Sequence, residues 1–217
     1  MDKATSFSQL AHEAFGEMVF AQKVVGADVD YKTQERAWKL FLREYRKFIR
    51  HAGEAAKHLG RKNWADNLEK ERKESDCLTY CYQARNAEEH GLEKGFQGHP
   101  SALSIGNMLS FSGACNNITI VNCTEITTGP SGEKIERRVD GQFSTIDGRV
   151  ANGWLNSEVP VARRLPYLQL KPVTNRGKSY SLPTLDVNYE DLAKAMVAHA
   201  CNWANKKNAE LKKFSQK

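Results

Sequence analysis

Residues 31–59, which read YKTQERAWKLFLREYRKFIRHAGEAAKHL, decide the fold of this chain. Their apolar side chains recur at alternating steps of four and three residues, at Trp38, Leu42, Tyr45, Ile49, Ala52, Ala56 and Leu59. Because an α-helix turns once in 3.6 residues, this period places them on one face of a long helix. Gly60 follows directly and suits a helix end, since glycine readily adopts the left-handed conformation found there. The stretch therefore predicts a long amphipathic helix that buries one face.

The flanking sequence also favours helices. Helical periodicity or charge pattern predicts further helices over residues 7–25, 63–75, 77–90 and 189–214. Asp76 can cap the helix that begins at Cys77, because its carboxylate can accept backbone N–H bonds, and Gly91 can end that helix. We expect the C-terminal helix to return and pack on the earlier ones.

The composition changes in the middle of the chain, where β-branched residues become frequent. Strands are predicted at residues 118–126, 136–145 and 164–170, and turns at Asp140-Gly141, Asp147-Gly148, Asn152-Gly153 and Asn175-Arg176-Gly177. The predicted fold class is mainly α (α+β). A helical bundle occupies residues 1–100, an antiparallel β-hairpin or meander insertion residues 101–185, and a closing helix with a basic tail residues 186–217.

Positive charge is concentrated in one part of the chain. The 217 residues carry 32 Lys+Arg against 26 Asp+Glu, a net charge of +6. In the long predicted helix, basic residues repeat every three or four positions, at Arg36, Lys39, Arg43, Arg46 and Arg50, and only Glu44 interrupts the positive charge. This stripe is either an RNA-binding ridge or the solvated face of an amphipathic helix.

The cysteines and the N-terminus bear on the cellular compartment. The first ten residues are polar, no apolar run approaches the ~20 residues needed to span a bilayer, and the five cysteines are an odd number. We therefore expect a reduced, cytoplasmic protein with no membrane association. Cys77 and Cys81 lie one helical turn apart, but no second close pair of ligands accompanies them, so we expect buried thiols and no metal.

One group of residues carries chemical information. Arg85-Asn86-Ala87-Glu88-Glu89-His90 ends the fourth predicted helix. Asn86 and His90 are four residues apart and share a face, whereas Arg85 and His90 lie about 140° apart around the axis. Two copies related by a twofold axis could place two arginines and two histidines around one groove. Such a groove suits RNA cleavage without a metal or other cofactor.

Each residue then has a defined task. His90 could remove the proton from a ribose 2′-hydroxyl or protonate the leaving 5′-oxygen. Arg85 could hold the phosphate and stabilise its developing charge, and Asn86 could orient His90 or bind a phosphate oxygen. Tyr82, one helical turn before Asn86, could line the groove or stack on a base.

Simpler interpretations of the same residues stay open. Arg85 and Glu89 are four residues apart and could form an ordinary surface ion pair. His90 could complement the helix dipole without a catalytic role. Arg46 and His51 show the same spacing in the middle of the long helix, so the spacing alone has little specificity.

At the Arg85–His90 motif the chain resembles the HEPN superfamily of helical proteins. The family motif is Arg, four to six residues, then His, with a polar residue, often Asn, after the Arg. The resemblance covers residues 7–91 and the closing helix from 189. It implies a homodimer whose groove contains Arg85, Asn86 and His90, and a metal-independent endoribonuclease.

The resemblance also implies partners. Many family members act in toxin–antitoxin, phage-defence or RNA-processing systems, which implies an RNA substrate and a neutralising protein partner. Other members do not cleave RNA, so a non-catalytic RNA- or protein-binding dimerisation module is the alternative. A third hypothesis is a structural dimer that binds its partner through the β part.

Overall fold

The long predicted helix is present as α2 (Tyr31–His58). The computed structural model describes residues 2–89, 95–100, 102–105, 109–112, 118–146, 149–155 and 161–215. At the start of α2 the Asp30 carboxylate accepts a hydrogen bond from the backbone N–H of Thr33 (3.0 Å), which fixes the first turn. The buried face of α2 is wider than predicted, because it also includes Phe41 and Phe48, both fully buried.

The other predicted helices are confirmed, with small shifts at their ends. They are α1 (Lys3–Val24), α3 (Lys62–Glu74), α4 (Asp76–Glu89) and α5 (Leu192–Ser215). The predicted cap of α4 is wrong by one residue. Asp76 is already helical, and the Ser75 hydroxyl accepts the hydrogen bond from the Leu78 N–H (3.4 Å). In the described part of the chain, no helix combines the length and apolar character needed to cross a membrane.

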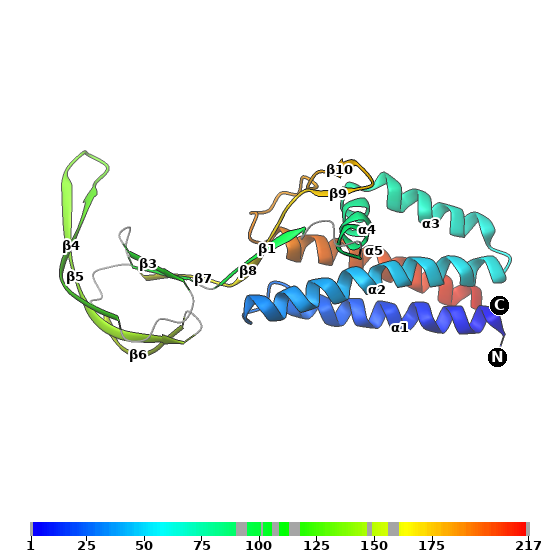
Figure 1. The fold of residues 1–217 in the computed structure, drawn as a ribbon, viewed down its shortest axis with the longest axis horizontal. Helices are drawn as coiled ribbons and strands as arrows, with labels where there is room; N and C mark the ends of the chain where they lie inside the picture. Colours follow the sequence, from blue (N-terminus) through cyan, green and yellow to red (C-terminus); the bar gives the residue numbers. More distant parts are fainter. Residues whose placement is uncertain are drawn as a thin grey trace. The chain divides into compact units, whose positions relative to one another are not determined.

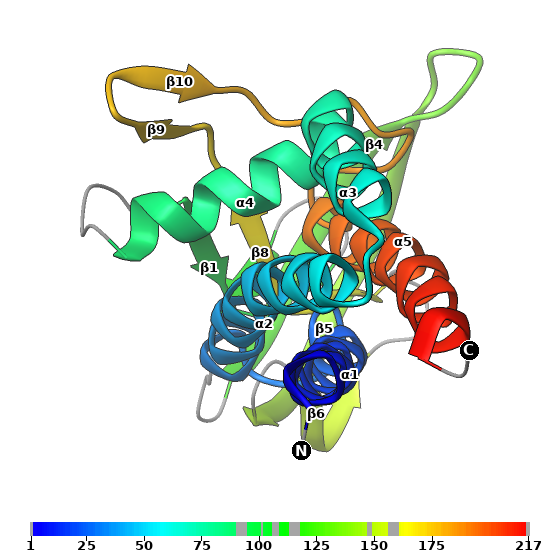
Figure 2. The same cartoon turned by 90° about the vertical axis from the view of Figure 1, so that its right-hand side faces the viewer.

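The five helices belong to one compact unit, formed by residues 1–98 and 168–217. Helix α1 packs along α2, and α5 packs against α1, α2 and α4. The C-terminal helix therefore returns to the bundle as predicted. Helix α4 crosses α2 instead of running beside it, as the two perpendicular views show (Figures 1 and 2). Its C-terminal end therefore reaches the outer surface of α2.

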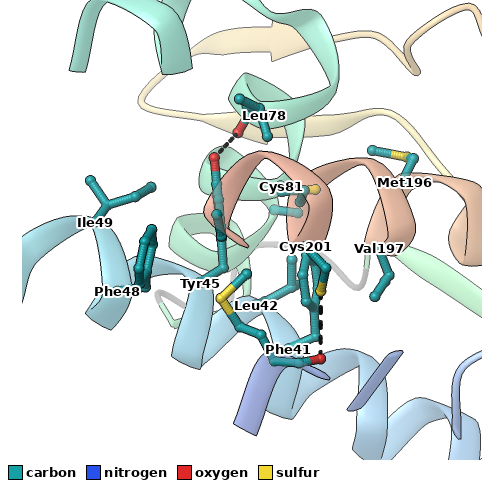
Figure 3. Close-up of a cluster of buried hydrophobic side chains, with 14 of the residues drawn as sticks. Phe41, Leu42, Tyr45, Phe48, Ile49, Leu78, Cys81, Met196, Val197 and Cys201 are labelled. Carbon is teal, nitrogen blue, oxygen red and sulfur yellow. Dashed lines mark hydrogen bonds between the residues drawn. The ribbon is translucent and has the colours of Figure 1, made fainter. Parts of the chain in front are cut away.

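The core lies where α2, α4 and α5 meet (Figure 3). Tyr45 is fully buried, and its hydroxyl donates a hydrogen bond to the backbone oxygen of Leu78 (3.2 Å). The Cys201 thiol donates to the backbone oxygen of Met18 (3.6 Å). These bonds satisfy polar atoms that burial would otherwise leave without partners. They also fix α2 relative to α4, and α5 relative to α1.

Strands complete the helical unit. β1 (Phe96–His99) is hydrogen-bonded to β8 (Tyr167–Leu170), and β9 (Val173–Asn175) pairs antiparallel with β10 (Lys178–Tyr180). Arg176 and Gly177 connect β9 and β10 with positive φ angles of 51° and 75°, as a two-residue hairpin of this handedness requires. The predicted turn at Asn175-Arg176-Gly177 is therefore confirmed.

The second compact unit spans His99–Tyr167 and consists of antiparallel strands. One sheet contains β2 (Ala102–Ile105), β3 (Leu109–Ser112) and β7 (Val161–Arg164). The other contains β4 (Ile118–Thr128), β5 (Lys134–Ile146) and β6 (Arg149–Leu155). The insertion was predicted to end at residue 185, whereas this unit ends at Tyr167, because β9 and β10 belong to the helical unit.

Two of the predicted turns in this region are wrong. Asp140-Gly141 lies inside β5, and Asn152-Gly153 lies inside β6. The pairing of β4 with β5 shifts register between Ile120 and Cys123, and such an irregularity lets a strand continue through a residue pair typical of turns. The turn between β4 and β5 instead uses residues 129–133, where Gly132 has a φ of 84°. The predicted turn at Asp147-Gly148 lies outside the described residues.

Helices α3 and α5 are joined through one carboxylate, that of Glu71. Trp203 Nε1 donates to Glu71 Oε2 (2.9 Å), and Lys207 Nζ donates to Glu71 Oε1 (2.7 Å). Partial burial raises the pKa of Glu71, but the hydrogen bonds from Lys207 and Trp203 together outweigh it and leave the pKa below its usual value. The ionised carboxylate therefore stabilises the fold, and this contribution is lost as the pH falls below the usual glutamate pKa of about 4.3.

We predict that Glu71→Gln lowers the free energy of unfolding by about 1 kcal/mol at pH 7, because Glu71 is partly exposed and its ion pair is partly screened. The difference should be smaller at pH ~3 than at pH 7, because the wild-type carboxyl is increasingly protonated below the usual glutamate pKa of about 4.3. Urea denaturation at both pH values measures it. Glu74→Gln is the matched control, because Glu74 on the same helix faces Lys70 at 3.8 Å with both side chains exposed. Equal losses for the two variants would contradict the prediction.

Candidate nucleic-acid interface

Arg85 lies on α4 where this helix crosses α2. Its neighbours Ala84 and Ala87 are buried and turn one face of α4 toward the core. The Arg85 side chain retains 19% of its accessible surface, so it lies at the boundary between the core and the solvent. The burial of the alanines therefore directs Arg85 toward the outer surface of α2.

Glu89 links α4 to α2. Its Oε2 atom lies 2.7 Å from a terminal nitrogen of Arg85 and 2.6 Å from a terminal nitrogen of Arg46. The hydrogen bond from Arg85 is the main cause that lowers the pKa of Glu89, and Arg46 adds to it. The surface ion pair between Arg85 and Glu89 is therefore present, and it includes a second arginine from α2.

A concave surface of about 410 Å³ lies between α2 and α4. It is lined by Arg36, Lys39, Leu40, Arg43, Arg85, Glu88 and Glu89. Arg85 therefore shares one cavity with three of the five basic residues predicted on α2. The structure brings together an arginine from the motif and the stripe on the long helix, which are about 40 residues apart in the sequence.

All five basic residues of the stripe line one or more depressions of the surface. Arg36 and Lys39 also border a larger neighbouring cavity of about 710 Å³. Arg46 and Arg50 border a third, of about 310 Å³, together with Tyr82. We call these three cavities together the α2 groove. These depressions are open to solvent, and the one at Arg46 and Arg50 is also lined by Glu54, Asp66 and Glu69, so the choice between the two interpretations of the stripe stays a prediction.

Carboxylates compensate some of the groove's positive charge. Lys39 Nζ lies 2.8 Å from Glu35 and 3.5 Å from Glu88. Arg43 Nε donates to the buried carboxylate of Glu44 (2.7 Å). Glu44 therefore partly neutralises the positive charge of Arg43.

Two cations of the stripe remain uncompensated at short range. Within the part of the chain that the structure describes, no carboxylate lies within ion-pair distance of Arg36 or Arg50. Both side chains are exposed. Their charges are therefore available to an anion in the groove.

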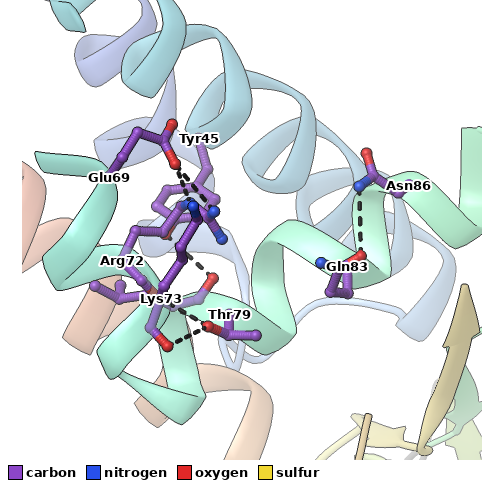
Figure 4. Close-up of polar contacts among 8 residues, drawn as sticks. Tyr45, Glu69, Arg72, Lys73, Thr79, Gln83 and Asn86 are labelled. Carbon is purple, nitrogen blue, oxygen red and sulfur yellow. Dashed lines mark hydrogen bonds and ion pairs between the residues drawn. The ribbon is translucent and has the colours of Figure 1, made fainter. Parts of the chain in front are cut away.

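Asn86 lies on another side of α4. Its amide nitrogen lies 3.5 Å from the side-chain oxygen of Gln83, and that oxygen also accepts a hydrogen bond from Asn175 of β9 (2.7 Å). Figure 4 shows Asn86 and Gln83 pointing toward one another along α4. The structure therefore places Asn86 on the side of β9, outside the cavity that contains Arg85.

The histidine of the motif, His90, lies outside the described residues. The other pair with the same spacing, Arg46 and His51, does not form a site. Arg46 contacts Glu89, whereas the His51 ring stacks on Phe7 of α1 with 6.0 Å between ring centroids. Partial burial lowers the pKa of His51. These two side chains therefore point to different sides of α2.

Tyr82 lines the groove, but another side chain already covers its ring. The Arg72 guanidinium lies 4.2 Å from the ring centroid and that of Arg46 lies 5.9 Å away. Arg72 is itself buried and paired with Glu69 (3.0 Å; Figure 4). Tyr82 therefore lines the cavity of Arg46 and Arg50 and not the one that contains Arg85, and its predicted role in RNA binding stays a prediction.

The cysteines considered as metal ligands are core residues. Cys77 and Cys81 are buried in the bundle, and burial raises the pKa of the Cys81 thiol. In the described residues, no group of three or more His, Cys, Asp or Glu side chains is arranged to hold a metal ion.

The groove residues that the sequence interpretation missed include Tyr31, Lys32, Phe96 and Lys171. Lys32 precedes Arg36 by four residues, so the same helical period could have found it. Phe96 and Lys171 reach the groove through β1 and the residue after β8. No local pattern marks them, because tertiary packing alone brings them to α2.

Comparisons with models of protein families, with curated proteins and with solved structures find no match for this chain.

The contact geometry predicts how Glu89 titrates. We expect Arg85→Ala to raise the pKa of Glu89 toward its usual value, and Arg46→Ala to raise it less, because Arg85 is the main cause of the lowered value. Carbon-13 NMR titration of the carboxyl group measures this. Lys57→Ala, which removes the partner of Glu54 elsewhere on α2, should leave Glu89 unchanged. A wild-type Glu89 pKa at the usual glutamate value would contradict the ion pairs of Glu89 with Arg85 and Arg46.

Proposed function

We propose that the α2 groove binds RNA and that the protein is a HEPN-like, metal-independent endoribonuclease. The observation that carries the proposal is the shared cavity of Arg85, Arg36, Lys39 and Arg43. A strand of RNA carries one negative charge per nucleotide, and a row of cations that neutralises several phosphates gains affinity through counterion release. The stripe on α2 supplies such a row.

Arginine suits the position at the end of α4. The guanidinium has a planar fork of N–H donors that can bind two phosphate oxygens at once. Arg85 can bind a phosphate in this way only when its ion pair with Glu89 opens. Glu89 then stays paired with Arg46 alone. The Glu89 carboxylate is exposed and its ion pairs are screened by water, so a phosphate in the groove can compete with it.

The proposed reaction is transfer of the phosphate to the 2′-oxygen of the same ribose. The 2′-oxygen bonds to phosphorus, the bond from phosphorus to the 5′-oxygen breaks, and the products are a 2′,3′-cyclic phosphate and a 5′-hydroxyl. His90 takes the 2′ proton or supplies the proton to the 5′-oxygen. Arg85 stabilises the extra negative charge on the phosphate oxygens. In a homodimer, one histidine could serve as the base and its partner as the acid.

A second candidate is a non-catalytic RNA- or protein-binding dimerisation module that uses the same groove. Two contacts favour it: Glu89 holds Arg85, and Asn86 points toward Gln83. A role in a toxin–antitoxin or phage-defence system, with a neutralising protein partner, is proposed from the HEPN resemblance alone. The two candidates differ in one observable, the formation of a cleavage product.

We predict that the purified protein cleaves single-stranded RNA in the presence of EDTA and leaves a 2′,3′-cyclic phosphate. Arg85→Ala should slow cleavage by a factor of about 10²–10³, the usual cost of losing one donor to a developing oxyanion. His90→Ala should slow it by about 10²–10⁴, the usual contribution of one acid or base. Gel analysis of end-labelled RNA and enzymatic analysis of the new ends measure these effects.

Lys70→Ala is the matched control for lost positive charge, because Lys70 is exposed on α3 and pairs only weakly with Glu74. It should cleave like the wild type, and thermal melting should show that all variants fold. Full activity of both Arg85→Ala and His90→Ala would remove these residues from the mechanism. RNA binding without any product would support the non-catalytic module.

A further inference from the structure

The largest cavity of the α2 groove has the composition of a nucleotide site. It is an open cavity of about 710 Å³, and its lining includes Tyr31, Lys32, Arg36, Lys39, Phe96 and Lys171. Small-ligand sites commonly enclose about 300–1,000 Å³ and combine apolar walls with a few placed polar groups. This cavity belongs entirely to the helical unit. Its aromatic rings and cations are the kinds of group that bind a base and a phosphate.

The charges of this cavity are strongly unequal. Four of its lining residues are cationic, Lys32, Arg36, Lys39 and Lys171, and one is anionic, Glu35. Glu35 is already bound by Lys39 at 2.8 Å. The exposed side chains of Lys32, Arg36 and Lys171 therefore form an excess of positive charge that attracts a phosphate.

Lys171 is held in place by a buried hydroxyl. The Tyr80 hydroxyl donates to the backbone oxygen of Lys171 (2.6 Å) and also lies 3.2 Å from the backbone oxygen of Gly95. The Lys171 N–H donates to the same Gly95 oxygen (2.8 Å). Burial raises the pKa of Tyr80, so this hydroxyl keeps its proton at neutral pH. The backbone on both sides of the cavity is therefore fixed to α4.

Two aromatic rings supply the apolar wall. Phe96 is buried, with the Lys39 ammonium 5.7 Å from its ring centroid, so it forms the floor of the cavity. Tyr31 is partly exposed and its ring lies directly against Gly98. A Cβ atom at residue 98 would lie 2.2 Å from Tyr31 Cδ2, which is less than any real contact. Glycine at this position therefore allows the Tyr31 ring to occupy the wall, where a base can stack on it.

We propose that this cavity binds one nucleotide of a single-stranded RNA, with the base on Tyr31 and the phosphate between Lys32, Arg36 and Lys171. The proposal rests on RNA binding in the α2 groove and specifies the class of RNA. A free nucleotide carries the same base and phosphate, so the test below includes one. Arg36 and Lys39 line both this cavity and the one that contains Arg85, so a continuous strand can fill both. A paired base within a duplex is stacked on its neighbours and cannot turn onto Tyr31.

The test uses the full chain and a 2′-O-methyl RNA of ~10 nucleotides, which cannot be cleaved because it lacks the attacking hydroxyl. One base is 2-aminopurine, whose fluorescence falls when it stacks on an aromatic ring. We expect Tyr31→Ala to weaken binding about tenfold and Tyr31→Phe to leave it unchanged, because stacking needs the ring and not the hydroxyl. Lys171→Ala should weaken binding about threefold without restoring the fluorescence.

The controls separate stacking from folding and from charge alone. Phe20→Ala removes an exposed aromatic ring of α1 that lies outside the three cavities, and it should bind like the wild type. Gly98→Ala should weaken binding as Tyr31→Ala does, because the added methyl group displaces the ring, while thermal melting shows a folded protein. The duplex form of the same RNA should bind more weakly than the single strand, and ATP should compete poorly.

The outcomes separate this inference from the proposed function. If Arg43→Ala and Arg85→Ala weaken RNA binding but the Tyr31 and Lys171 variants do not, the nucleotide site is refuted and the RNA-binding groove stands. Equal affinity for duplex and single strand would also refute it. Binding of ATP through Tyr31 without binding of RNA would refute both the RNA assignment of this cavity and the proposed function.

Discussion

The burial of one face of α2 is the constraint on which the rest of the structure depends. Trp38, Phe41, Tyr45 and Phe48 are each at most 1% exposed, and full burial of a side chain of this size contributes about 1.5–3 kcal/mol. Rotation of α2 by one residue would turn several of these rings toward water. Repulsion between exposed like charges amounts to at most about 1 kcal/mol per pair. Aromatic burial therefore outweighs charge repulsion, and it determines that the basic stripe lies along one side of α2.

The crossing of α4 over α2 turns this stripe into a groove. An isolated amphipathic helix would display Arg36 and Arg43 on a convex surface, where phosphates gain little from several cations at once. The end of α4 adds Arg85 as a second wall, and β1 and Lys171 extend the concavity toward the start of α2. Glu89 joins the two helices through Arg46 of α2 and also pairs with Arg85 on its own helix. The same contact restrains Arg85, so structure and proposed chemistry compete for one carboxylate.

The helical part of the fold could be predicted from the sequence because each helix carries its own period and ends at residues typical of helix termini. The wider buried face of α2 was missed because the prediction followed one narrow stripe, although Phe41 and Phe48 keep the same helical period, three or four residues from Trp38 and Tyr45. The turns assigned to Asp140-Gly141 and Asn152-Gly153 failed because long strand pairing overrode local turn preference. The stripe on α2 was predictable by period, whereas its partners Phe96 and Lys171 depend on strand placement, which has no local signal. The proximity of Arg85 to this stripe likewise follows only from the crossing of α4.

The dependence of RNA affinity on salt tests the central claim most directly. For single-stranded RNA the logarithm of the binding constant falls by about 0.7 per neutralised phosphate for each tenfold rise in salt. If the stripe and Arg85 engage about five phosphates, the slope should be about −3.5, and Arg36→Gln with Arg50→Gln should make it shallower by about 1.4. Arg138→Gln, a charge removed from β5, should leave the slope unchanged. An affinity that does not depend on salt, or a slope equally reduced by the Arg138 variant, would contradict a phosphate-binding groove on α2.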